Sequence, residues 1–142
     1  MATRNTLIED EYAFLWYYPD AGIVHHEFLQ PASDDAFRKV LMTGLKLLKE
    51  HGAQKWLSDD RKNSILSAES SAWSQDYWLP LAAKAGWRQW AMLPTANPRG
   101  QVNLKRLMKY VNETYGIRVE VFSDRDAAWQ WLAQQGSEAE SE

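Results

Sequence analysis

A strand-like segment, a polar turn and an amphipathic helix follow one another without a gap between Lys55 and Pro80. The apolar run at residues 53–58 has the length of a strand, and the chain then stays hydrophilic as far as Ser64. Apolar residues return at positions that share one side of a helix: Trp73, Tyr77, Trp78 and Leu81. A strand that leads through a short turn into a helix is typical of α/β folds, so this stretch restricts the fold class.

The same alternation of strand and helix covers most of the chain. Strands are predicted at residues 11–18, 22–29, 53–58, 87–93 and 117–121, and helices at 33–51, 67–85, 101–115 and 123–135. The first two strands are joined by a segment with turn chemistry, Pro19-Asp20-Ala21-Gly22, and are therefore expected to form an antiparallel hairpin. Each later strand follows a helix and must run parallel through a right-handed crossover. We predict a single α/β domain with a mixed sheet.

The predicted domain spans residues 11–135. Residues 1–10 are polar and are expected to be a loosely ordered N-terminus, and residues 136–142 are small and acidic and are expected to be a disordered tail. A chain of 142 residues has the length of one domain, and it contains no internal repeat or linker. Pro80 lies inside the second predicted helix, which it is expected to kink or divide.

Composition excludes several kinds of protein. The chain has no cysteine, which excludes disulfides, thiol catalysis and thiolate metal sites. Its net charge is −3 and its Lys and Arg residues are scattered, so the sequence has no basic patch for nucleic acid. No segment approaches the ~20 apolar residues of a membrane span, and the first residues lack the apolar core of a signal peptide. We therefore expect no nucleic-acid binding, no membrane insertion and a cytoplasmic location.

Several short motifs carry a family resemblance. They are the run Trp56-Leu57-Ser58-Asp59-Asp60-Arg61-Lys62, Ser67 with Glu69, Trp73, Trp78-Leu79-Pro80, Gly86, and the closing run Ala128-Trp129-Gln130-Trp131-Leu132. Through these motifs residues 10–135 resemble the SpoIIAA-like family, relatives of the STAS domains of anti-sigma-factor antagonists and sulfate transporters, with some likeness to the lipid-binding Sec14 fold. The resemblance implies a STAS-like sheet covered by helices.

The resemblance does not extend to the regulatory serine of that family. Anti-sigma-factor antagonists of this type place a phosphorylatable Ser directly after an Asp, where a strand meets the following helix. In this chain Asp60 follows Asp59, and the nearest later hydroxyls belong to Ser64 and Ser67. Regulation by a kinase is therefore not expected, and whether Ser64 or Ser67 is phosphorylated stays open.

Ligands of open α/β sheets tend to lie beyond the carboxyl ends of the strands. Four predicted loops gather at that edge, at residues 30–34, 59–64, 95–100 and 123–124. Their candidate binding residues are Asp59, Asp60, Arg61, Asn63, Ser64, Thr95, Asn97 and Arg99. Arg61 and Arg99 are positioned to face an anion near a helix N-terminus. The alternative is that Arg61 pairs with Asp59 or Asp60 and stabilises the turn.

Residue patterns for metal binding and catalysis are absent from the sequence. His25 and His26 are neighbours on a predicted strand and point to opposite faces, so they cannot chelate one ion, and no metal site is expected. The chain has no Gly-x-Ser-x-Gly elbow and no Gly-rich phosphate loop, so no cofactor is expected. Asp59 and Asp60 remain a conceivable acid and base pair, but we expect a protein that is not an enzyme.

The aromatic content suggests where a partner or ligand binds. The chain has eight Trp, and Trp73, Tyr77 and Trp78 cannot all face the core from one helix. Partly exposed aromatic residues mark an interface or the mouth of an apolar pocket, and Trp73 and Trp78 are therefore candidates, although such residues also shield the rim of a core.

Two functions follow from these features. The first is a regulatory interaction module that binds an unknown protein partner and self-associates as a homodimer. The alternative is a carrier that holds a small apolar or anionic, lipid-like ligand between the second helix and the sheet, as the Sec14 likeness implies.

Overall fold

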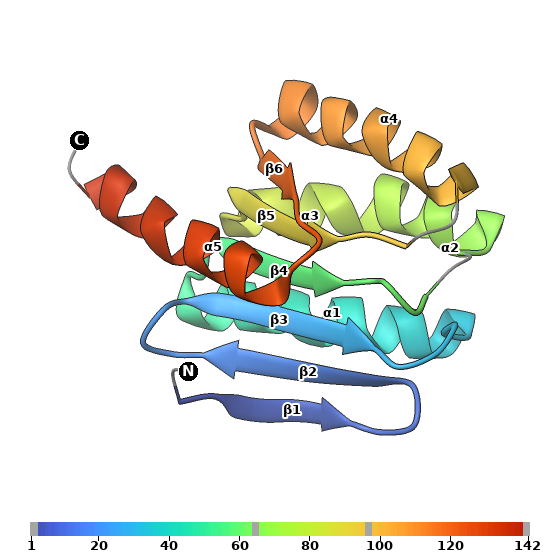
Figure 1. Cartoon of the computed structure of the whole chain (residues 1–142), viewed down its shortest axis with the longest axis horizontal. Coiled ribbons are helices and arrows are strands. Elements are labelled where there is room, and N and C mark those ends of the chain that lie inside the picture. The colour runs from blue at the N-terminus through green and yellow to red at the C-terminus, as the bar shows by residue number, and fades with distance from the viewer. Residues whose placement is uncertain (1–2, 64–65, 96–97, 141–142) are drawn as a thin grey trace.

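The computed structural model describes residues 3–63, 66–95 and 98–140, apart from the side chains of residues 98–103 and 136–140. Six strands in this part of the chain form one sheet, and their order in the sheet is their order in the sequence (Figure 1). They are β1 (Asn5–Glu9), β2 (Ala13–Tyr18), β3 (Ile23–Phe28), β4 (Lys55–Asp59), β5 (Gln89–Leu93) and β6 (Arg118–Val121). The pairs β1–β2 and β2–β3 are antiparallel, and the pairs from β3 to β6 are parallel. The predicted α/β fold with a mixed sheet is confirmed.

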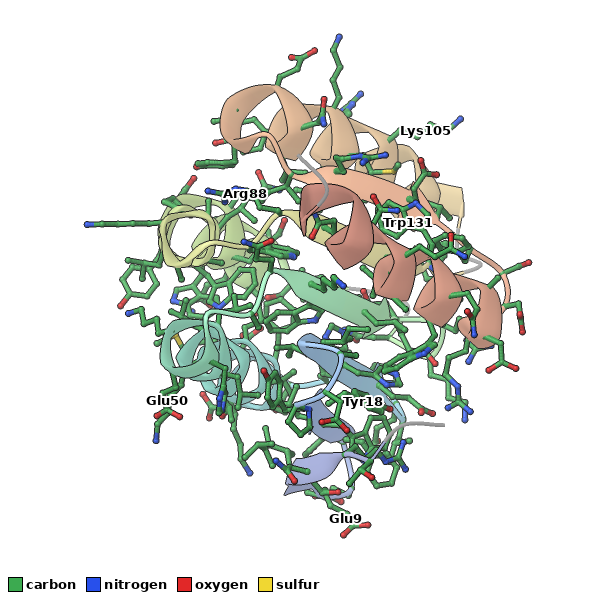
Figure 2. The ribbon with its side chains drawn as sticks, turned by 90° about the vertical axis from the view of Figure 1, so that its left-hand side faces the viewer. Glu9, Tyr18, Glu50, Arg88, Lys105 and Trp131 are labelled. Carbon is green, nitrogen blue, oxygen red and sulfur yellow. The ribbon has the colours of Figure 1, made fainter. Side chains whose placement is uncertain are left out.

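Helices connect the parallel strands and cover the sheet. They are α1 (Asp34–His51), the continuous segment of α2 (Ala68–Trp73), η1 (Ser74–Trp78) and α3 (Leu79–Ala85), then α4 (Pro98–Tyr115) and α5 (Arg125–Glu140). The connecting helices lie on one face of the sheet, and α5 crosses the opposite face over β4 and β5 (Figure 1). Side chains fill the space between the helices and the sheet, and Glu9 and Glu50 lie at the outside of the molecule (Figure 2).

The two faces of the sheet carry separate hydrophobic cores because strand residues alternate between them. On the face of α1, α3 and α4, Val24, Trp56 and Trp90 align across three neighbouring strands and are buried. On the face of α5, Leu57 and Leu93 pack with residues of β2 and α5. Both faces of the sheet are therefore covered.

The second predicted helix passes Pro80 without dividing. Pro80 has no N–H, and its ring disfavours a regular α-helical turn before it. The chain instead makes a π-helical turn over η1, in which the amide of Leu79 donates to the carbonyl of Ser74, five residues earlier. The helix then continues as α3 to Ala85. The expected disturbance at Pro80 is thus a π turn, a feature that occurs frequently at functional sites.

The structure departs most from the predicted elements in three places. Residues 5–9, predicted to be loosely ordered, form β1, and Ile8 of this strand is buried in the core. The third predicted helix begins at Pro98, a residue type that is well tolerated in the first turn of a helix. Arg99 and Gly100 are therefore helical rather than part of a loop. Helix α5 continues to Glu140, so residues 136–140 are helical where a disordered tail was predicted, and residues 141–142 lie outside the described chain.

Candidate functional site

The carboxyl ends of β3, β4, β5 and β6 lie at one edge of the sheet because these strands are parallel. Glu27 of β3 aligns with Asp59 of β4, which aligns with Leu93 of β5. The amide of Ala32 donates to the Asn63 side-chain oxygen at 3.1 Å, which joins the loop after β3 to the loop after β4. The loop after β3 and the loop after β4 therefore meet at this edge, and Asn63 links them.

The side chains of Asp59 and Asp60 lie on opposite faces of the sheet. Asp59 is 2% exposed and follows Leu57 on the α5 face. The Arg61 guanidinium binds both of its carboxylate oxygens, with Nε 2.9 Å from Oδ1 and Nη2 2.7 Å from Oδ2. Burial acts to raise the pKa of Asp59, but the hydrogen bonds and charge of Arg61 outweigh it and hold that pKa below its usual value. Arg61 therefore pairs with Asp59 in the turn.

A cavity of about 130 Å³ lies on the other face, between the sheet and the helical layer. Most of its lining is apolar or aromatic: Phe37, Leu41, Trp56, Leu66, Trp78, Leu79, Trp87, Trp90, Met92 and Leu107. Its polar lining consists of His26, Ser58, Asp60, Ser74 and Gln75. Three lining residues, Ser74, Gln75 and Trp78, belong to η1. The π turn before Pro80 therefore forms one side of the cavity. An apolar lining with few polar groups is the usual construction of a small-molecule site.

Four Trp rings in this lining pack against one another. Ring centroids are 5.3 Å apart between Trp56 and Trp78, 5.4 Å apart between Trp78 and Trp87, and 5.0 Å apart between Trp87 and Trp90. All four indole N–H groups donate hydrogen bonds to the protein, at 2.7–3.0 Å. Their N–H groups are therefore occupied, and what the rings offer to a ligand is their π surface.

A chain of hydrogen bonds positions Asp60 beside these rings. The Trp56 indole donates to Nδ1 of His26 at 2.9 Å, and because an indole N–H only donates, Nδ1 carries no proton. The proton of neutral His26 is therefore on Nε2, which donates to Oδ1 of Asp60 at 2.8 Å. Oδ2 of Asp60 has no hydrogen-bond partner among the residues that the structure describes. His26 therefore holds one carboxylate oxygen of Asp60, a residue of the cavity lining, and leaves the other unengaged by the described residues.

His25 lies on the opposite face of β3, as the strand alternation predicts. Its ring is 1% exposed and contacts the Tyr18 hydroxyl, 3.1 Å from Nδ1, while its Nε2 is buried without a hydrogen-bond partner. Burial is the largest cause that lowers the pKa of His25, to about 3. The two neighbouring histidines therefore face different cores, and among the described residues no three His, Cys, Asp or Glu side chains are arranged to hold a metal ion.

The other candidate residues lie around the cavity or outside the described chain. Trp78 is buried and lines the cavity, whereas Trp73 is half-buried outside it, with the Arg38 guanidinium 5.2 Å from its ring centroid. Thr95 is half-buried two residues after the end of β5. Ser64, Asn97 and the Arg99 side chain lie outside the described residues.

Ser67, the other open phosphorylation candidate, joins two helix N-termini. Its hydroxyl accepts from the amide of Ser70 at 2.9 Å, as an N-cap of α2, and donates to Asp34 of α1 at 2.7 Å. Hydrogen bonds from Ser67 and Ser70 hold the pKa of Asp34 below its usual value. The Ser67 hydroxyl thus has a structural role in the turn before the π-helical segment.

Sequence reasoning missed most of the cavity wall. The sequence patterns point to His26 only as a possible metal ligand, and they do not mark Trp56, Trp87, Trp90 or Ser58 as site residues. The alternation of side chains along the strands does contain a signal for this wall. His26 and the residues of the neighbouring strand β4 that point to the same face of the sheet must lie in one layer beneath the helices.

No protein-family model, curated protein or solved structure matches this chain. None of the helices in the described part of the chain has both the length and the apolar character needed to cross a membrane.

Proposed function

We propose that this protein is a STAS-like binding protein, related to the SpoIIAA-like family, that holds a small and mainly apolar molecule in the cavity beneath the four Trp rings. The observation that carries the proposal is the cavity itself, bounded by the sheet and the π turn. It favours the carrier over the interaction module as the first function. A volume of about 130 Å³ suits a molecule with a single ring or a short chain, because an apolar cavity of roughly 150 Å³ holds benzene.

The polar groups of the cavity support binding rather than catalysis. Both ring nitrogens of His26 are occupied, by Trp56 and Asp60, so the imidazole has no nitrogen left to activate a nucleophile. The Ser58 hydroxyl accepts the Trp90 N–H at 2.8 Å. A reaction requires a nucleophile, a base and a stabilising group in position around a common point. We therefore propose a protein that binds without chemical change of its ligand.

Benzyl alcohol is expected to raise the melting temperature by about 4 °C at ten times its Kd, because binding to the folded state then contributes about 1.4 kcal/mol. The increase is expected to disappear in Leu107→Trp, which places a larger side chain in the lining of the cavity. Leu7→Trp is the matched control, because Leu7 is exposed on β1 and does not line the cavity. Equal stabilisation of both variants, or none of the wild type, contradicts the proposal.

A protein-interaction module is the second candidate, and one observation favours it. Tyr77 of η1 is 52% exposed and Tyr110 of α4 is 42% exposed, and both belong to the helical layer. Exposed tyrosines are enriched in protein interfaces. Sedimentation equilibrium tests self-association: a dimer that Tyr77→Arg converts to a monomer supports this candidate, and a monomer at all concentrations removes the homodimer.

A further inference from the structure

We infer that the cavity selects a small organic ammonium ion, an inference that rests on the proposed binding function and assigns its ligand class. Three properties of the cavity lead to it: the sign of the charge in its lining, the π surface of its wall and the available oxygen of Asp60.

The charge of the lining is negative. Among the described residues that line the cavity, Asp60 carries the only formal charge, since His26 is neutral in the hydrogen-bond pattern above and no Lys or Arg is present. The nearest cation in the sequence after Asp60 is Arg61, which is bound to Asp59 on the other face of the sheet. An anionic ligand would meet this carboxylate without a compensating charge, and a cation would be attracted to it.

The aromatic wall favours the same sign. The face of an indole ring carries negative electrostatic potential, and Trp attracts cations more strongly than Tyr or Phe. Such contacts contribute about 0.5–1 kcal/mol at exposed sites and about 2 kcal/mol when the cation is desolvated. With the N–H groups of all four rings already bonded within the protein, a ligand meets ring faces and edges. An aromatic wall with one carboxylate is the arrangement that recognises ammonium groups.

Asp60 is suited to receive the ammonium group. His26 holds Oδ1 at 2.8 Å, which restricts the rotation of the carboxylate and leaves Oδ2 to accept a hydrogen bond from the ligand. The Asp60 side chain is 28% exposed, so the charged end of a ligand would stay near water while its apolar end enters between the rings. A charge-assisted hydrogen bond of this kind is roughly twice as strong as a neutral one. The expected ligand is a primary amine attached to one ring or to a short aliphatic chain.

Three ligands of similar shape and different charge test the inference: benzylamine, benzyl alcohol and benzoate. We expect isothermal titration at pH 7 to show that benzylamine binds at least tenfold more tightly than benzyl alcohol, and that benzoate binds most weakly. In Asp60→Asn the tenfold preference for benzylamine over benzyl alcohol is expected to vanish, because Asn keeps an acceptor for His26 but carries no negative charge. Asp76→Asn, which removes an exposed carboxylate of η1 outside the lining, is the matched control and is expected to keep the preference.

The possible outcomes separate the inference from the proposed function. If benzyl alcohol binds as tightly as benzylamine, or if the preference survives Asp60→Asn, the ammonium selectivity is wrong and the apolar cavity function stands. Tighter binding of benzoate than of benzylamine also overturns the selectivity. If none of the three ligands binds the wild type, both the selectivity and the proposed function fail.

Discussion

Replacing Gly44 by Ala is expected to destabilise the protein by about 2 kcal/mol, although Ala normally stabilises a helix interior by about 1 kcal/mol relative to Gly. Gly44 lies in the middle of α1, and a Cβ atom there would overlap the outer edge of the Trp56 ring. The Trp56 ring has little freedom to move away, since its N–H is bonded to His26 and its ring centroid lies 5.3 Å from that of Trp78. The measurement is the free energy of unfolding in urea.

A double-mutant cycle controls for the effect of Ala on the helix itself. Trp56→Phe removes the part of the indole that lies against α1, so Gly44→Ala is expected to cost much less in that background. If Gly44→Ala stabilises the wild type, or costs the same in both backgrounds, the close approach of α1 to Trp56 is wrong. Because the Trp56 N–H also orients His26, and His26 orients Asp60, the same contact places the polar end of the cavity.

Stability is expected to fall by on the order of 4 kcal/mol between pH 6.5 and pH 3 because of His25. Burial is the main cause that lowers the pKa of His25 in the folded protein, from its usual value of 6.5 to about 3. Within this interval the unfolded chain binds one proton more than the folded chain, so acid favours unfolding by about 1.4 kcal/mol for each pH unit. Above pH 6.5 the ring is neutral in both states, and the full stability is present.

His25→Phe is expected to remove most of this pH dependence, because Phe keeps an aromatic ring beside Trp16 and Tyr18 and cannot be protonated. Urea unfolding at intervals between pH 7 and pH 4 measures the difference in slope between the variant and the wild type. Below pH 4 both proteins are expected to lose stability together, since the lowered pKa values of Asp10, Asp34 and Asp59 are unaffected. An unchanged slope between pH 6 and pH 4 would show that His25 is not buried as described.

Local sequence patterns predicted the face of each strand residue well. Alternation along the strand predicts that His25 and His26 point to opposite faces, and the observed contacts of both histidines agree. The period of two is a property of the strand itself and needs no knowledge of its neighbours. The same reasoning explains why Asp59 and Asp60, predicted together as one turn, separate to opposite faces once β4 extends to Asp59.

The cavity could not be derived in the same way, because its wall combines several elements. Trp56 and Trp90 are adjacent only through the parallel register of β4 and β5, and Trp87 lies before β5. Periodicity within one helix marks Trp73 and Trp78 as candidate site residues, and of these two only Trp78 lines the cavity. The contact of Gly44 with Trp56 is also invisible in the sequence, since it depends on how closely α1 packs on the sheet.

The first strand shows the same limit at the edge of the sheet. Residues 5–9 include several polar side chains, and their composition predicts no strand. In the structure Ile8 is the one buried residue of β1. Pairing with β2 nevertheless satisfies their backbone groups, with a shift in register between Thr6 and Ile8. Strand pairing of this kind is set by the neighbouring strand rather than by the intrinsic preference of the segment.

The central claim is that a small molecule enters the cavity beneath the four Trp rings, and the indole N–H signals of the eight Trp residues test it most directly. In a titration with benzyl alcohol followed by ¹⁵N–¹H correlation spectra, the signals of Trp56, Trp78, Trp87 and Trp90 are expected to shift with one Kd of about 1 mM or lower. The signals of Trp16 and Trp129, which lie on the α5 face, are expected to stay in place. Shifts confined to Trp16 and Trp129, or no shift of any indole signal, would contradict the binding site.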